Sequence, residues 1–106
     1  MMIDREELLE VRDDLCLRVQ SIELNLPRLS RAALLREVHS IKGVARAYGL
    51  NAMATLAHHL EAAIAGEAGG ALVTTYLDRM VDALGCNDDP ATINTLLASV
   101  NVRLQA

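Results

Sequence analysis

Aromatic side chains are nearly absent: the 106 residues include two tyrosines, no tryptophan and no phenylalanine. The hydrophobic fraction is nevertheless 52%, so the core has to be built from Leu, Ala, Val, Ile and Met. This composition favours packed helices over a sheet, which draws on β-branched and aromatic residues. The length fits one domain over residues 1–106 and suffices to bury one core without disulfides.

Other features are equally scarce. No apolar run approaches the roughly 20 residues that span a bilayer, and the acidic start MMIDREELLE lacks the regions of a signal peptide. Cys16 and Cys86 form no CxxC pair, which indicates reduced thiols. The net charge of −4 argues against a nucleic-acid partner. We therefore expect a cytoplasmic monomer without a membrane partner, and the two ends of the sequence favour a free-standing protein.

Five segments carry apolar residues at helical spacing. The first segment starts at Asp4, with Glu7 at N3, and ends near Asn25 before Pro27, and the second starts at Ser30 and stops at Gly49. The third starts at Asn51 and ends at the loop 66–70. The fourth carries apolar residues from Val73 to Leu84 and ends at the break GCNDDP, and the fifth starts at Asp89 with Pro90 at its first position. The connections between them are short. The sequence thus predicts an all-α fold, an antiparallel four-helix bundle with an additional C-terminal helix packed on its side.

The stretch VHSIKGVARAYG, residues 38–49, has an unusual arrangement of polar residues. One stripe of the expected helix carries His39, Lys42, Gly43 and Arg46 at i, i+3, i+4 and i+7, and Arg36 extends it. Because the core stripe lies about 100° away, His39 should lie at the surface among cations. A neutral imidazole keeps one ring nitrogen free as a nucleophile, and cations suit an anion such as a phosphoryl group.

Gly43 and Glu61 add to this pattern. A glycine inside a helix costs about 1 kcal/mol relative to alanine, so Gly43 indicates a place where another large surface approaches the helix. The short turn at Gly49 should fold the next helix back beside His39, with His58 and Glu61 at the same level. A carboxylate there can accept a hydrogen bond from one nitrogen of His39 and fix its tautomer.

These residues resemble a known family. The pattern HSIKGVARAYG, read as His-x-x-Lys-Gly followed by five residues and Gly, is similar to the signature of histidine phosphotransfer (HPt) domains. The stretch LAHHLE is similar to the helix of that family's third motif. The wording HSIKG, with His58 and Glu61 downstream, is closest to the phosphoacceptor domain of chemotaxis-type sensor kinases. The order of the helices agrees with that family over about residues 5–104, and the motif residues that carry the resemblance lie between residues 34 and 61.

The resemblance implies a role for each of these site residues. His39 is the residue phosphorylated, on Nε2, and Glu61 holds Nδ1. Lys42 lies by the phosphoryl group, and His58 belongs to the same hydrogen-bond network.

The resemblance also implies partners. Gly43 admits the partner, and the expected docking surface adds Arg46, Arg36 and Leu35; Arg46 replaces a small or uncharged residue of many members. A sensor histidine kinase or a response-regulator receiver domain exchanges the phosphoryl group. Mg²⁺ is expected on the receiver domain, with no cofactor or metal on this chain. The chain lacks a Gly-rich nucleotide loop, so it is expected to be a carrier without kinase activity of its own.

Two alternatives stay open. A metal-binding bundle could use His39, His58, His59 and Glu61, although adjacent helical residues such as His58 and His59 point about 100° apart. The other alternative is a structural interaction module that keeps the fold without phosphotransfer. The intact His39, Lys42 and Gly43 argue against the latter.

Overall fold

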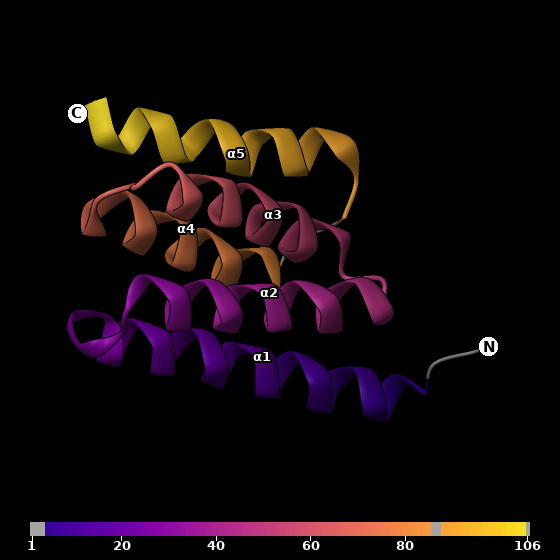
Figure 1. The fold of residues 1–106 in the computed structure, drawn as a ribbon. Coiled ribbons are helices and arrows are strands. Elements are labelled where there is room, and N and C mark those ends of the chain that lie inside the picture. Colours follow the sequence, from indigo (N-terminus) through magenta and orange to yellow (C-terminus); the bar gives the residue numbers. More distant parts are fainter. Residues whose placement is uncertain (1–3, 86–87, 106) are drawn as a thin grey trace.

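The computed structural model describes residues 4–85 and 88–105, with side chains up to residue 100. Within these residues the elements are α1 (Arg5–Asn25), the 3-10 helix η1 (Leu26–Arg28), α2 (Arg31–Ala47), α3 (Asn51–Ala65), α4 (Gly70–Ala83) and α5 (Pro90–Gln105), shown in Figure 1. The all-α prediction is confirmed. Cys86 lies outside the described residues, and Cys16 is a free thiol. No helix in the described part of the chain is long and apolar enough to cross a bilayer.

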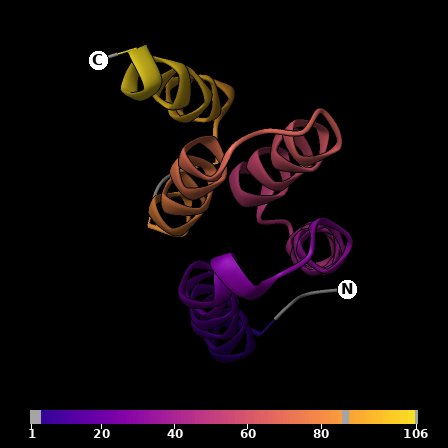
Figure 2. The ribbon, with the colours of Figure 1, turned by 60° about the vertical axis from the view of Figure 1, so that its left-hand side comes forward.

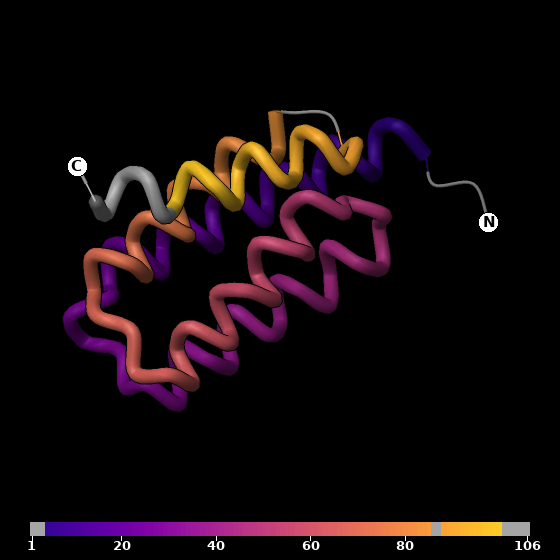
Figure 3. The backbone as a smooth tube through the Cα atoms, turned by 90° about the horizontal axis from the view of Figure 1, so that it is seen from above, coloured from indigo at the N-terminus to yellow at the C-terminus, as the bar shows by residue number. Residues whose placement is uncertain are grey.

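The first four helices form the predicted bundle. Seen along the helices, α2 lies between α1 and α3, and α4 closes the bundle against both α1 and α3 (Figure 2). Consecutive helices run in opposite directions, as the backbone trace shows (Figure 3). The fifth helix packs on α4 and α3, outside the bundle, as expected. One face of α2 is consequently left open between α1 and α3.

The core consists of the apolar stripes that the sequence predicts. Fully buried residues come from each of the four bundle helices and include Leu15, Val19, Val38, Ile41, Leu56, Leu60, Leu77 and Met80. Burying one such side chain stabilises the fold by about 1.5–3 kcal/mol. Val38 and Ile41 hold α2 in one rotation about its axis, which determines the side chains that it presents to solvent.

The turn between α2 and α3 sets the register of these two helices. Gly49 adopts a φ of 72°, which favours glycine. Its N–H donates to the Arg46 carbonyl over 3.2 Å, and the Leu50 N–H donates to the Ala45 carbonyl over 2.8 Å. This is the Schellman arrangement of a helix end, and it confirms Gly49 as the predicted stop. The compact turn brings the last turns of α2 directly beside the first turns of α3.

The connection from α3 to α4 uses an unexpected residue. The predicted loop 66–70 is one residue shorter, because Gly70 already belongs to α4. A second helix end of the Schellman type closes α3, with the Ala68 N–H donating to the Ala63 carbonyl over 2.9 Å. Its left-handed position is filled by Glu67, with a φ of 63°, rather than by one of the neighbouring glycines. A non-glycine residue thus occupies the left-handed position of this connection, against the usual preference for glycine.

The α1 cap also differs in detail from the predicted capping box. The Asp4 carboxylate accepts from the Glu6 N–H over 3.2 Å, as an N-cap does. Glu7 instead accepts a hydrogen bond from the Tyr48 hydroxyl over 3.0 Å. This bond joins the start of α1 to the end of α2, and it raises the pKa of Tyr48 because the carboxylate favours the protonated phenol.

The N-terminus of α3 is capped from a distant part of the chain. Asn51, the predicted cap, is the first helical residue, and Leu50 at the N-cap offers no side-chain hydrogen bond. The Asp88 carboxylate accepts from the Asn51 N–H over 2.9 Å and from the Ala52 N–H over 3.0 Å. A carboxylate satisfies two free N–H groups here and lies at the positive end of the helix dipole. The segment that leads into α5 thus stabilises the helix that carries Glu61.

Replacing Asp88 with Ala should lower the free energy of unfolding by about 1–2 kcal/mol, the usual effect of losing an N-cap. Asp88→Asn should cost less, because an amide oxygen still accepts a hydrogen bond. Chemical denaturation measures both effects. Asp13→Ala, an exposed carboxylate on α1, is the matched control; an equal loss in this control would mean that the Asp88 bonds do not stabilise α3.

Candidate functional site

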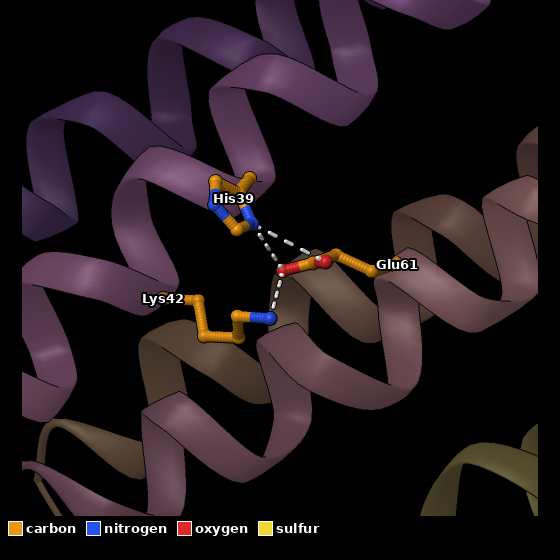
Figure 4. Close-up of polar contacts among 3 residues, drawn as sticks. All are labelled: His39, Lys42 and Glu61. Carbon is orange, nitrogen blue, oxygen red and sulfur yellow. Dashed lines mark hydrogen bonds and ion pairs between the residues drawn. The ribbon is translucent and has the colours of Figure 1, made fainter.

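His39 projects from the open face of α2. Its side chain is 71% exposed, while Val38 and Ile41 beside it are fully buried. The predicted surface position is therefore confirmed. Figure 4 shows the imidazole standing out from α2 with its edge toward α3.

Glu61 on α3 contacts the His39 ring. The distances from Nδ1 to the two carboxylate oxygens Oε1 and Oε2 are 3.3 and 3.5 Å. The expected register across the Gly49 turn is confirmed. A carboxylate can only accept here, so the contact favours a proton on Nδ1 and leaves Nε2 with its lone pair. In Figure 4 the other ring nitrogen lies on the side of the ring that is turned away from Glu61.

Lys42 lies deeper than the predicted surface stripe. Its side chain is only 11% exposed, and Nζ is 2.8 Å from Glu61 Oε1. Lys42 follows the buried Val38 by one helical turn, so its aliphatic stem packs in the seam between α2 and α3 while the ammonium pairs with the carboxylate. Lys42 therefore lies on the Nδ1 side of the His39 ring and neutralises Glu61 (Figure 4).

Lys42 and His39 determine the protonation state of Glu61. Partial burial raises the pKa of this carboxyl, but the hydrogen bonds and charges of Lys42 and His39 together outweigh burial, so its pKa lies below the ordinary value. The carboxylate consequently stays ionised at neutral pH. An ionised acceptor is what holds the Nδ1 proton of His39 in place.

Glu61→Gln should lower the free energy of unfolding at neutral pH by about 1–3 kcal/mol, because the ammonium of Lys42 loses its charged partner. The pKa of Glu61 is lower in the folded chain than when unfolded, so its contribution is complete above the ordinary value of 4.5 and is lost as the pH falls below it. The difference between wild type and variant should therefore shrink in acid. Denaturation at several pH values, with the exposed Glu10→Gln as control, measures it; a constant difference would contradict the ion pair.

The predicted docking residues surround His39 on the same face. Gly43 is exposed, and a Cβ atom built on it would meet nothing within 4 Å. The fold itself therefore does not require glycine at this position. Arg36 and Arg46 are exposed and form no ion pair within the described residues, whereas Leu35 is half-buried against the core.

His58 lies outside the bonds among His39, Lys42 and Glu61. It is exposed, and its ring packs edge-on against His59, with the centroids 6.1 Å apart at 87°. In the parts of the chain that the structure describes, no three His, Cys, Asp or Glu side chains converge in a way that could hold a metal ion. The metal-site alternative has no geometric support.

One contact near His39 was not predicted from the sequence. Arg18 on α1 donates from Nη2 to the Ser40 hydroxyl oxygen over 2.6 Å. Ser40 follows His39 directly, but Arg18 lies 22 positions earlier. Nothing in the local pattern around Arg18 points to this contact, since it depends on how α1 and α2 are rotated against each other.

Comparison with known proteins agrees with this site. Residues 6–86, which span the four bundle helices apart from the first residue of α1, match the family model described as the Hpt domain. No curated protein and no solved structure gives a match. Hpt domains serve histidine phosphotransfer in phosphorelay signalling, and they generally interact with receiver domains and histidine kinases. With a family match over most of its length and an exposed histidine on the second helix, this chain belongs to the Hpt domain family.

Proposed function

We propose that His39 accepts a phosphoryl group on Nε2 and exchanges it with an aspartate of a response-regulator receiver domain. The observation that carries the proposal is the pairing of an exposed imidazole with an ionised carboxylate at Nδ1. This pairing leaves Nε2 as the free nucleophile on the accessible face. Family membership supports the same reaction.

The residues of this chain suggest how the transfer proceeds. The lone pair of Nε2 forms the bond to phosphorus while the bond from phosphorus to the aspartyl oxygen breaks, and the aspartate leaves as a carboxylate. The ring becomes cationic as the bond forms, with its proton still on Nδ1. Glu61 lies where it can stabilise that cation, and the same atoms serve the reverse reaction. The receiver domain would contribute the Mg²⁺ that balances charge on the phosphoryl group.

Lys42 has a supporting role in this proposal. A free carboxylate at Nδ1 would also repel an incoming phosphoryl anion. The ammonium 2.8 Å from Glu61 Oε1 offsets that charge without displacing the hydrogen bond to the ring. The resemblance places His58 in the hydrogen-bond network of His39; the side chain of His58 is exposed one helical turn before Glu61, and the described residues form no bond between it and His39.

The partners follow from the family and from the charges on the open face. Hpt domains generally interact with receiver domains and histidine kinases. For this chain we propose a sensor kinase as a source of phosphoryl groups and a receiver domain as the transfer partner. The docking surface would comprise Gly43, Arg46, Arg36 and Leu35, where the two exposed arginines suit an anionic rim. The HSIKG wording with His58 and Glu61 supports a relation to the phosphoacceptor domains of chemotaxis-type kinases.

A transfer assay tests the proposal. The chain is incubated with phosphoramidate, the labelled residue is located by mass spectrometry, and a receiver domain with Mg²⁺ is then added. We expect an acid-labile phosphate on His39 that moves to the receiver, but not to a receiver whose acceptor aspartate is replaced by Asn. Binding of the receiver without any labelling would favour the structural interaction module instead. Profiling several receiver domains would identify the partner.

A further inference from the structure

The two sides of the His39 ring differ in what surrounds them. The Nδ1 side faces α3, where Glu61 and Lys42 occupy the space beside the ring. The opposite ring nitrogen is turned away from this pair (Figure 4). Because α2 lies between α3 and α1 (Figure 2), the flank of α2 opposite Glu61 is the flank covered by α1. A group attached to Nε2 therefore lies on the side of the ring away from Lys42.

Arg18 provides a cation on that flank. It is half-buried on α1, and its Nη2 reaches over to Ser40 at 2.6 Å. Ser40 is the next residue after His39 and lies about 100° further round the helix. Beside this contact the surface has an open hollow of about 250 Å³, lined by Arg18, Ser21, Ile22, Asn25, Leu29 and Glu37. The guanidinium thus lies at the residue that follows His39, with open space beside it.

The charge of Arg18 is not neutralised by a carboxylate. Its contact in the structure is a neutral hydroxyl, and although Glu37 lines the same hollow, the two form no ion pair among the described residues. A guanidinium has five N–H donors in a planar fork that matches phosphate oxygens. Most of these donors remain available. An anion that formed near Ser40 would find a positioned cation without displacing a salt bridge.

We propose that Arg18 binds the phosphoryl oxygens of His39 once that residue is phosphorylated, with Ser40 holding the guanidinium in place beforehand. This inference rests on the proposed function and adds a residue from α1 to the site. Lys42 then pairs with Glu61 on one side of the ring, while Arg18 binds the phosphoryl group on the other. The charged groups on the elements beside the phosphorylated ring are Glu61 and Lys42 toward α3, Arg36 and Arg46 along α2, and Arg18 on α1, while Glu37 points to the opposite side of α2 from His39.

Phosphorus NMR of the phosphorylated chain tests this contact. The second ionisation of the phosphoryl group is titrated in wild type, Arg18→Gln and Arg18→Lys after labelling with phosphoramidate. Loss of a nearby cation disfavours the dianion, so the midpoint in Arg18→Gln should rise by about half a pH unit, and Arg18→Lys should restore part of the shift. Arg28→Gln removes the same charge from an exposed position on η1 and should leave the midpoint unchanged.

The outcomes separate this inference from the proposed function. A chain that takes no label on His39 contradicts the proposed function. A chain that is labelled but titrates identically in wild type and Arg18→Gln contradicts the Arg18 contact alone. If Arg18→Gln fails to fold, the guanidinium NMR signals of Arg18 are compared in the wild-type chain before and after labelling. They should shift more than those of Arg28, and unshifted Arg18 signals would overturn the inference.

Discussion

Replacing His39 with Gln is expected to abolish phosphoryl uptake and leave the fold intact. The glutamine amide has no nucleophilic nitrogen, so the bond to phosphorus cannot form. The side chain of His39 is 71% exposed, and exposed substitutions usually change the free energy of unfolding by less than about 0.5 kcal/mol. Labelling with phosphoramidate measures uptake, and thermal denaturation measures stability.

Two histidines elsewhere in the chain provide controls for this experiment. His58 and His59 are also exposed, but within the described residues neither forms a hydrogen bond or an ion pair with Glu61. Their Gln variants should still be labelled. Retained labelling of His39→Gln, or loss of labelling only in a variant of His58 or His59, would show that the phosphoacceptor has been assigned to the wrong residue.

Gly43→Leu should separate docking from folding. A Cβ atom at Gly43 meets nothing within 4 Å, so the fold accommodates a side chain there. Leucine also favours a helix interior over glycine, and stability should rise by up to about 1 kcal/mol. The same side chain would project from the face that a receiver domain must approach. We expect transfer to the receiver to slow at least tenfold, equivalent to about 1.4 kcal/mol.

A small donor makes this test sharper. Phosphoramidate needs no docking surface, so labelling of Gly43→Leu by it should stay near the wild-type rate while transfer to the receiver falls. Gly43→Ala should show a smaller effect, and Ala91→Leu, at an exposed position on α5, controls for added surface bulk. Normal transfer by Gly43→Leu would mean that the partner does not approach over this residue.

Residues close together in the sequence account for what could be predicted of the fold. Helix starts at Asp4, Ser30 and Asp89 depend on a side chain and an N–H group two or three residues further on. The stop at Gly49 depends on one left-handed residue. Helical periodicity alone places His39 on the surface and Ile41 in the core.

The contact between His39 and Glu61 was predictable for a similar reason. A three-residue connection around Gly49 leaves little freedom in how α3 folds back along α2, so counting residues from the turn gives the level at which side chains meet. The same counting does not predict which residues of α1 meet α2. The two helices are joined through η1, and the sequence pattern does not fix the rotation of α1 about its own axis.

Amino-acid order by itself determined the five helices, their apolar faces and the pair of His39 and Glu61, because each depends on local geometry or on one short turn. Tertiary structure alone decided that Asp88 caps α3, that Lys42 turns inward to Glu61 and that Arg18 reaches Ser40. These contacts depend on the rotation and spacing of whole helices, which the packing of the complete core sets at once. Local sequence patterns do not specify that packing.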